Sequence, residues 1–186
     1  MCNIFSRLFK KANKEDDLHK KECKINELCS KLMLPDKGKT LLKHLHVTRE
    51  DGFNDFTILT QAWHESGRFI KVIGEYNYWG IKKPRDWTGK VYKVRTHEYI
   101  NNKRVNMDCE FIDFSACGMA VAWWIDLVKR LYPDAYKNRN NPVLFFEGLI
   151  SGKYKYATDP FYFNKLNTLY KRISTNAYLL QLLDIV

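Results

Sequence analysis

Residues 61–69 read QAWHESGRF and end a helical run of apolar residues with one carboxylate, Glu65. Apolar residues recur at helical spacing over 55–66, and Gly67 predicts the end of that helix. Glu65 falls close to the apolar side rather than opposite it. A carboxyl group held beside Trp63 would lose hydration, which raises its pKa toward that of a general acid. A solvated glutamate at a helix end is the alternative, and this stretch alone leaves both interpretations open.

Composition places the chain among basic, globular proteins. Its 186 residues are enough for one domain with an extension. Aromatic residues make up 15%, a high share that predicts either a large aromatic core or a cleft in which sugars or bases stack. The formal net charge of +10 favours a polyanionic partner, such as nucleic acid, an anionic membrane surface or a bacterial cell wall.

The cysteines and the N-terminus indicate the compartment of synthesis. Five cysteines without a CxxC pair predict free thiols and a reducing compartment: Cys2, Cys23, Cys29, Cys109 and Cys117. The first residues lack the apolar core of a secretory signal, and no run reaches the roughly 20 apolar residues of a spanning helix. We therefore expect synthesis in the cytoplasm. The segment MCNIFSRLFKK is either a frayed terminus or a short basic patch that touches a membrane.

Periodicity and turn signals predict a mainly helical chain with one β-hairpin, hence the α+β class. Helices are expected over residues 14–34, 38–47, 55–66, 115–132, 142–152, 160–173 and 176–186. Strands are expected over 90–100 and 104–114, after a structured loop over 67–90. We expect residues 1–35 to form an N-terminal helical, basic extension and residues 36–186 to form one domain.

Several finer expectations concern helix ends and buried faces. Leu18 is expected on the buried side of the first helix. Ser115 is expected to cap a helix that Pro133 closes, and Ser174 or Thr175 is expected to begin a separate last helix. The inward side chains of the helix over 115–132 would be Met119, Ala122, Trp123, Leu127 and Leu131.

Cleavage of a glycosidic bond normally needs a second carboxylate, or an acetamido group of the substrate in its place. Six carboxylates in the loop and hairpin are candidates: Glu75, Asp86, Glu98, Asp108, Glu110 and Asp113. Glu98 stands out because it precedes Tyr99 near the hairpin tip, where it could swing over a cleft. An ordinary strand charge is the alternative for each of the six.

The segment YNYWGIKKPRDW, residues 76–87, concentrates aromatic side chains around a glycine. Their faces could bind sugar rings, while Asn77 bonds hydroxyl and acetamide groups. The same mixture could stack the bases of single-stranded nucleic acid, or could form a core.

Other chemistries lack their motifs. The chain has no GxGxxG, Walker A or GxSxG sequence. His64 and Glu65 begin like the zinc motif HExxH, but position 68 is arginine, and the five histidines form no ligand set. We therefore expect neither a metal nor an organic cofactor.

Five motifs, in one order and spacing, resemble the glucosaminidase family (glycoside hydrolase family 73), which includes flagellar peptidoglycan hydrolases, autolysins and phage lysins. They are ILTQAWHESG, YNYWGIK, WTGKVYKVRTHEYINN, CEFIDFSACGMAVAWWIDLV and YKYATDPFYFNKL, and they span about residues 38–173. Arg68 and Phe69 depart from the Trp-Gly that often follows ESG in the family. An arginine usual after the second strand is also absent, and Asn102 replaces a glycine at the hairpin tip.

The resemblance implies a lysozyme-like α+β fold, with a helical body and a hairpin lobe beside the catalytic cleft. It also implies hydrolysis of the β-1,4 bond after N-acetylglucosamine in peptidoglycan, with residues 36–186 as the catalytic domain. Glu65 would be the general acid, Glu98 the second carboxylate, and Tyr156 a cleft tyrosine near the acid. We expect substrate contacts from Tyr76, Asn77, Tyr78, Trp79, Gly80, Tyr99 and Asp159.

We therefore expect a peptidoglycan endo-β-N-acetylglucosaminidase that acts on glycan strands and not on nucleic acid. It would reach the periplasmic cell wall by holin release or as part of a phage virion, with residues 1–35 docking it to a membrane or particle. A cellular enzyme with an unconventional exit is the alternative. It would be a monomer unless assembled into that particle. The alternatives are a muramidase, a non-catalytic wall-binding or structural module, and a nucleic-acid-binding protein.

Overall fold

The computed structural model describes residues 18–48, 52–100, 103–157 and 159–180, without the side chains of 47–48, 97–100 and 103–104. A helix over 18–31 comes first. The elements that follow are α2 (Asp36–Thr48), α3 (Asp55–Glu65), β1 (Val91–Ile100), β2 (Lys103–Ile112), α4 (Cys117–Leu131), α5 (Pro133–Lys137), α6 (Pro142–Ser151) and α7 (Tyr162–Leu179).

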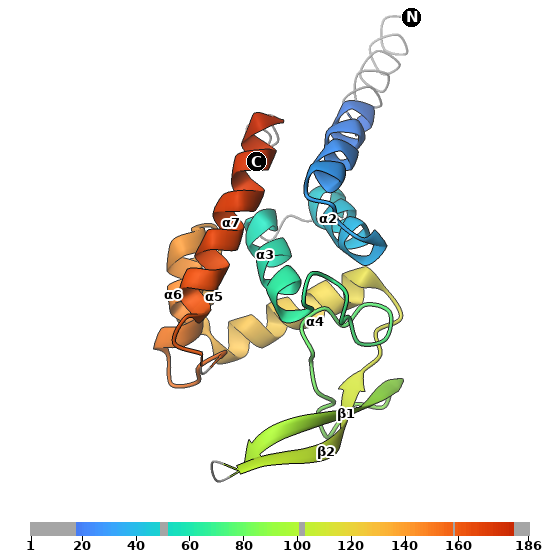
Figure 1. The fold of residues 1–186 in the computed structure, drawn as a ribbon, viewed down its shortest axis with the longest axis vertical. Helices are drawn as coiled ribbons and strands as arrows, with labels where there is room; N and C mark the ends of the chain where they lie inside the picture. The colour runs from blue at the N-terminus through green and yellow to red at the C-terminus, as the bar shows by residue number, and fades with distance from the viewer. Residues whose placement is uncertain (1–17, 49–51, 101–102, 158, 181–186) are drawn as a thin grey trace, which may run out of the picture.

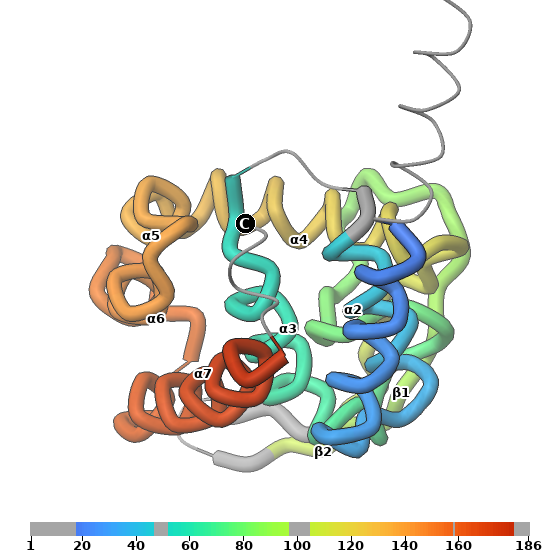
Figure 2. The backbone as a smooth tube through the Cα atoms, turned by 90° about the horizontal axis from the view of Figure 1, so that it is seen from above, coloured from blue at the N-terminus to red at the C-terminus, as the bar shows by residue number. Residues whose placement is uncertain are grey.

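The helices form one body from which the hairpin projects (Figure 1). β1 and β2 pair antiparallel along their whole length, from Val91 opposite Ile112 to Ile100 opposite Lys103. α3 lies between α7 on one side and α2 with the helix over 18–31 on the other (Figures 1 and 2). The predicted α+β chain, mainly helical with one hairpin, is confirmed for the part of the chain that the structure describes.

α3 is the central helix, because buried side chains occur all round it. Asn54 caps its first turn: the side-chain oxygen accepts a hydrogen bond from the backbone N–H of Thr57 at 3.1 Å. The apolar residues of this helix are all buried: Phe56, Ile58, Leu59, Ala62 and Trp63. A helix that is buried on every side needs neighbours all round, and α2 and α7 supply two of them.

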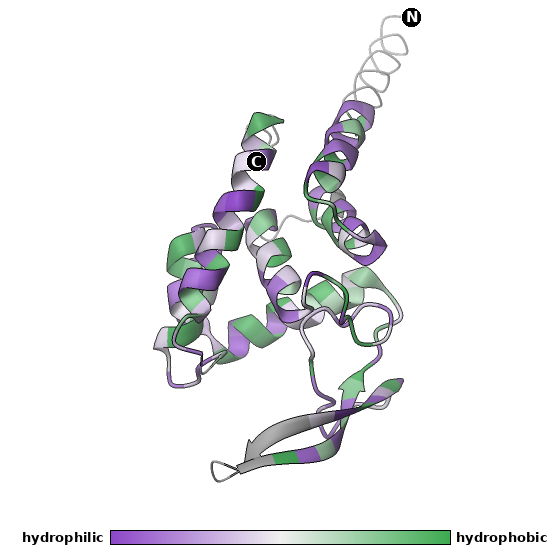
Figure 3. Cartoon of the chain, in the orientation of Figure 1, coloured by the Kyte–Doolittle hydropathy of each residue, from purple (hydrophilic) through white to green (hydrophobic). Residues whose placement is uncertain are grey.

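The helix over 18–31 contributes to the same hydrophobic core. Ile25, Leu28 and Cys29 are buried in one cluster of apolar side chains that extends to α7. Leu18 is 46% exposed instead of buried, because the helix extends past α2 at this end (Figure 1). Hydrophilic and hydrophobic bands alternate along this helix and along α7, as in amphipathic helices (Figure 3). The domain boundary at residue 35 stays a prediction.

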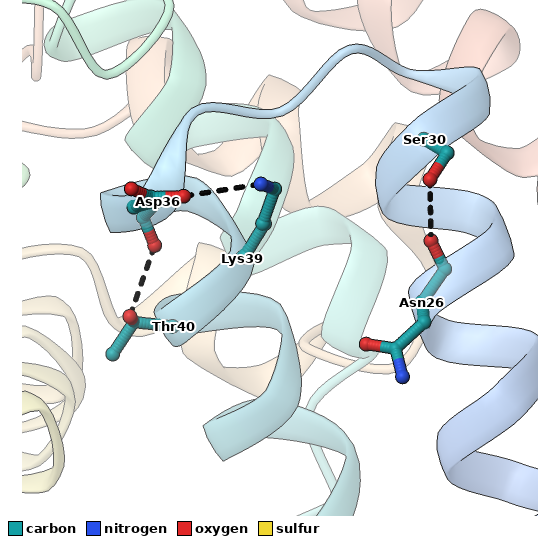
Figure 4. Close-up of polar contacts among 5 residues, drawn as sticks. All are labelled: Asn26, Ser30, Asp36, Lys39 and Thr40. Atoms are coloured by element: carbon teal, nitrogen blue, oxygen red, sulfur yellow. Dashed lines mark hydrogen bonds and ion pairs between the residues drawn. The ribbon is translucent and has the colours of Figure 1, made fainter.

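Local hydrogen bonds satisfy polar groups where this helix turns into α2 (Figure 4). The Asp36 carboxylate accepts from the Lys39 ammonium at 3.0 Å, and the Asp36 carbonyl accepts from the Thr40 hydroxyl at 2.9 Å. At the end of the preceding helix, the Ser30 hydroxyl donates to the Asn26 carbonyl at 3.0 Å. These bonds are exposed to solvent and satisfy polar groups near the ends of the two helices.

The buried face of α4 differs from the predicted one by about one residue. The predicted inward side chains are exposed or half-buried: Met119, Ala122, Trp123, Leu127 and Leu131. The buried ones are instead Ala120, Val121, Trp124 and Val128. Trp124 stacks on Trp79 with ring centroids 5.1 Å apart, whereas Trp123 meets Trp87 at 5.6 Å. Two adjacent tryptophans have the same hydropathy, so periodicity could not decide which one faces the core.

Two helix ends differ from the prediction, and the short helix α5 was not predicted. The N-cap of α4 makes no side-chain hydrogen bond, so Ser115 does not cap it. Pro133 begins α5 as well as ending α4, because a first-turn proline needs no N–H partner. α7 continues through Ser174 and Thr175. The Ser174 hydroxyl donates to the Lys171 carbonyl at 3.2 Å within that helix, so it does not cap a new one.

The described cysteines are unpaired, as predicted. Cys29 and Cys109 are buried, Cys117 is half-buried and Cys23 is exposed, while Cys2 lies outside the described residues. No helix in the described ranges is long and apolar enough to cross a membrane.

Asn77 clamps the loop between α3 and β1 onto the hairpin. Its amide nitrogen donates to the carbonyls of Ile81 and Ile112, both at 2.9 Å. Its amide oxygen accepts from the backbone N–H of Ile81 at 2.8 Å. The side chain is 1% exposed, so these bonds replace water for three buried backbone groups. Gly80 takes a left-handed φ of 61° within this clamp.

Replacing Asn77 by alanine should lower the free energy of unfolding by about 3 kcal/mol, because it leaves buried backbone groups without partners. Urea denaturation measures this loss. The exposed Asn26 is the matched control, and Asn26→Ala should change stability by less than about 0.5 kcal/mol. Equal losses in the two variants would show that the clamp contributes nothing specific.

Candidate active site

Glu65 is the last residue of α3 and is half-buried. Its Oε1 atom accepts a hydrogen bond from the Tyr162 hydroxyl at 2.6 Å. Burial raises the pKa of Glu65 above the ordinary carboxyl value, and the Tyr162 hydrogen bond opposes this with a smaller effect. Glu65 therefore keeps its proton to higher pH than a solvated glutamate, which is the state that a general acid requires.

A second residue of α3 holds the Tyr162 hydroxyl. Gln61 donates to it from Nε2 at 3.2 Å and lies one helical turn before Glu65, on the same face. Tyr162 is 2% exposed and begins α7. Because its oxygen accepts from Gln61, its proton is directed to Glu65. The bond uses Oε1 and leaves Oε2 to carry the acidic proton.

Three tyrosine rings gather around this carboxyl group. Tyr156 stacks on Tyr162, with ring centroids 6.1 Å apart and an interplanar angle of 21°, and meets Tyr132 at 5.2 Å. Burial first, and then the negative charge of Glu65, raises the pKa of each of these tyrosines. They remain neutral phenols, so they place no second negative charge beside the acid.

Two buried polar atoms of this cluster make no hydrogen bond: Oε1 of Gln61 and Nε1 of Trp124. Both side chains lie near the Tyr156 hydroxyl and slightly lower its pKa, without reaching hydrogen-bond geometry. Leaving a buried donor and acceptor unpaired costs stability. A catalytic role is one explanation for such groups in a native structure.

The chain leaves α3 through a tight turn directly after Glu65. Gly67, Arg68 and Phe69 all adopt left-handed backbone conformations, with φ of 55°, 64° and 64°. Two of them are not glycine, which makes the turn strained. Ser66 holds it, because its hydroxyl donates to a carbonyl one turn earlier in α3 and accepts from the N–H of Phe69 at 3.0 Å. The helix therefore ends at the acid, and no further helical turn covers it.

The structure brings Tyr156 and Glu65 together, as expected of two residues predicted to be catalytic. Glu98 and Tyr99 lie in β1 near the hairpin tip, but their side chains are outside the described residues. The catalytic role of Glu98 and the substrate contact of Tyr99 stay predictions.

Most of the aromatic–glycine segment is core instead of surface. Asn77, Tyr78 and Trp79 are at most 5% exposed, and the hydrogen-bonding groups of Asn77 all bond backbone. Burial thus corrects the expectation that these three side chains contact substrate. Tyr76 is half-buried and Gly80 is exposed, and their substrate contacts stay predictions.

Asp159 anchors the beginning of α7. Its Oδ1 accepts from the backbone N–H of Phe161 at 2.9 Å, and its Oδ2 pairs with the Lys165 ammonium. The hydrogen bond from Lys165 is the main reason why the pKa of Asp159 is lowered. These bonds position the turn that carries Tyr162, and a direct substrate contact of Asp159 stays a prediction.

Three residues of the cluster escaped the sequence interpretation: Tyr162, Gln61 and Tyr132. Tyr162 closes the motif YATDPFY, so the motif itself contained the signal. Gln61 precedes Glu65 by one helical turn, which predicts a shared face. Tyr132 follows α4 without any motif that marks it.

The site offers a proton donor. Within the described ranges, no group of three or more His, Cys, Asp or Glu side chains could hold a metal ion. A half-buried carboxyl group held by a neutral phenol has the arrangement that general acid catalysis requires.

Residues 45–175 match the glucosaminidase family, described as mannosyl-glycoprotein endo-beta-N-acetylglucosaminidase. The match covers well over half of the chain, so the chain belongs to the glucosaminidase family. No curated protein matches the chain.

Solved structures confirm the lysozyme-like fold. A peptidoglycan hydrolase mutant from Sphingomonas sp. A1 is 26% identical with a TM-score of 0.57, over 76% of this chain and 92% of that one. The C-terminally truncated glycoside hydrolase domain of FlgJ from Salmonella typhimurium is 23% identical with a TM-score of 0.55. The match covers 81% of this chain and 98% of that domain. The catalytic domain of the autolysin Auto from Listeria monocytogenes is 22% identical with a TM-score of 0.55. The match covers 90% of this chain and 96% of that domain.

Replacing Glu65 by glutamine should stabilise the folded protein at neutral pH. Burial raises the carboxyl pKa in the folded state, so folding favours the protonated form. Stability therefore falls as pH rises from the ordinary carboxyl range through the raised pKa. Glutamine carries no charge, and its amide oxygen can still accept from Tyr162.

Urea denaturation at several pH values measures this effect. The free energy of unfolding of Glu65→Gln should exceed that of the wild type near neutral pH. The excess should shrink toward about pH 4, where the glutamate becomes neutral like the glutamine. An excess that does not change with pH would contradict a raised pKa at Glu65.

Proposed function

We propose that this glycoside hydrolase is a peptidoglycan hydrolase that cleaves the β-1,4 bond after N-acetylglucosamine, an endo-β-N-acetylglucosaminidase. The observation that carries the proposal is the half-buried Glu65, with its raised pKa and its 2.6 Å hydrogen bond from Tyr162. Membership of the glucosaminidase family supports it. The similar structures of a peptidoglycan hydrolase and an autolysin also support it.

In the proposed mechanism, Glu65 gives its proton to the glycosidic oxygen while the bond to the anomeric carbon breaks. A carboxylate then forms in a half-buried site. The Tyr162 hydroxyl already donates to Oε1, so it stabilises that charge as it develops. Tyr156 stays a neutral phenol beside Glu65 and can donate a hydrogen bond to the sugar.

The sugar cation that develops needs a partner of opposite charge. Glu98 on the hairpin is the proposed group, and it would activate water or stabilise the transition state. Alternatively, the acetamido group of the substrate acts as the nucleophile. A distance between the carboxyl groups of about 5–5.5 Å would favour retention of configuration, and about 6.5–9.5 Å would favour inversion.

We also propose a biological role as a phage lysin, released through a holin or carried in a virion. The unpaired cysteines fit synthesis in the cytoplasm. The net charge of +10 fits attraction to an anionic, periplasmic cell wall. Residues 1–35 are the proposed docking segment, and the enzyme is proposed to be a monomer outside a particle.

The central experiment digests purified peptidoglycan and identifies the fragments by mass spectrometry. The wild type should release fragments that end in reducing N-acetylglucosamine. Glu65→Gln should lower turnover by about 10²- to 10⁴-fold, because it removes the general acid. Glu147→Gln is the matched control: Glu147 is an exposed carboxylate on α6, and its loss should leave turnover unchanged.

Each contrary outcome points to a different conclusion. Reducing N-acetylmuramic acid ends would make the enzyme a muramidase. Turnover of Glu65→Gln within a few fold of the wild type would remove Glu65 from the mechanism. Binding to the wall without any released sugar would indicate a non-catalytic module.

A further inference from the structure

A groove runs along α7, next to residues that adjoin the catalytic cluster in the chain. Two hollows, of 680 Å³ and 280 Å³, share Trp63, Arg68 and Arg172 in their walls. The larger hollow follows α7, and the smaller one opens toward the turn before α2, at Met33. The three shared residues form the junction of the two hollows.

The groove begins beside the acid. His64 and Phe161 line the larger hollow, and they adjoin Glu65 and Tyr162 in the chain. The His64 ring packs against Tyr162 edge to face, with centroids 5.3 Å apart. One wall residue of the larger hollow therefore packs against the tyrosine that bonds the acid.

The walls of the groove are cationic. Neither Arg68 nor Arg172 has an ion-pair partner among the described residues. The Arg172 guanidinium lies over the indole of Trp63, 5.8 Å from the ring centroid. Among the described residues, no aspartate or glutamate lines either hollow. Arginine binds carboxylates through two parallel hydrogen bonds, so an anionic ligand fits these walls.

Arg68 is held in place by the strained turn after Glu65. Its φ of 64° is unfavourable for a side chain other than glycine. Phe69, the next residue, is 3% exposed and packs against Trp63 at 5.9 Å, which anchors the turn in the core. Strain of this kind persists only where the surrounding structure holds it, and it concentrates at functional sites.

Apolar side chains complete the groove. Met33, Ile70 and Phe161 line it and are 84%, 79% and 61% exposed. Exposed apolar groups next to unpaired cations suit a ligand that carries both methyl groups and carboxylates.

We propose that this groove binds the peptide stem of peptidoglycan, with Arg68 and Arg172 bonding the stem carboxylates. The inference rests on the proposed function, which supplies the glycan that carries the stem. Stem peptides combine free carboxylates with small methyl side chains, and the groove offers unpaired guanidinium groups beside apolar ones. Binding there selects glycan strands that still carry stems.

The test compares glycan strands that carry peptide stems with the same strands after the stems have been removed. The wild type should have a KM about tenfold lower for stem-bearing strands, since charge-assisted hydrogen bonds contribute on this order to affinity. The double variant Arg68→Gln with Arg172→Gln should lose this preference. Its kcat on stem-free strands should remain that of the wild type, which also shows that the variant is folded.

The matched control is Lys129→Gln with Lys137→Gln. This control removes two positive charges, as the arginine double variant does. One of them also lies over an aromatic ring, because the Lys129 ammonium is 5.7 Å from the Tyr136 ring centroid. This control should keep the stem preference. Titration of wild type with a free stem peptide gives a second readout, and Arg68→Gln alone should weaken that binding.

The inference is overturned by a wild type that cleaves both substrates with equal KM, or by a double variant that keeps the preference. Binding of the groove to anionic vesicles, lost in the double variant without any stem preference, would assign it to a membrane surface instead. A wild type that cleaves neither strand would refute the proposed function itself, which separates the two failures.

Discussion

The hydrogen bond between Tyr162 and Glu65 joins the end of the central helix to the beginning of α7, across 97 residues of sequence. Around it, Gln61 orients the tyrosine from α3, and Asp159 anchors the turn that delivers it. The helical body thus brings a carboxyl group from one segment and its hydrogen-bond donor from another. Burial alone would raise the pKa of Glu65 without directing its proton, whereas the tyrosine occupies one carboxyl oxygen and leaves the other for catalysis.

The turn after Glu65 serves two purposes. It ends α3 at the acid, and it places Arg68 in the wall of the groove along α7. Its three left-handed residues are stable because Ser66 bonds both sides of the turn and Phe69 is packed in the core. Local strain at this point is therefore balanced by packing elsewhere, which is typical of sites where geometry serves function.

The sequence predicted the order of the elements apart from α5, but it could not predict which surfaces meet. Glu65 and Tyr156 lie in motifs with an interpretable order, and the structure brings the two residues together. The choice between Trp123 and Trp124 as the buried residue of α4 depended on the position of Trp79, which is a tertiary contact that periodicity does not contain.

Polar residues were misread for a similar reason. Asn77 suggested a sugar ligand, because an amide that bonds backbone looks the same in sequence as one that bonds a substrate. Tyr162 lay in a recognised motif, yet only the packing of α7 against α3 shows that its hydroxyl meets the acid.

The most direct test of the central claim is an NMR titration of the Glu65 carboxyl carbon in the wild type and in Tyr162→Phe. The account predicts a wild-type pKa above the ordinary glutamate value, since burial is the dominant influence. It predicts a still higher pKa in Tyr162→Phe, because the carboxylate then loses the hydrogen bond that stabilises it. A wild-type pKa at or below the ordinary value, or a lower pKa in the variant, would contradict the account.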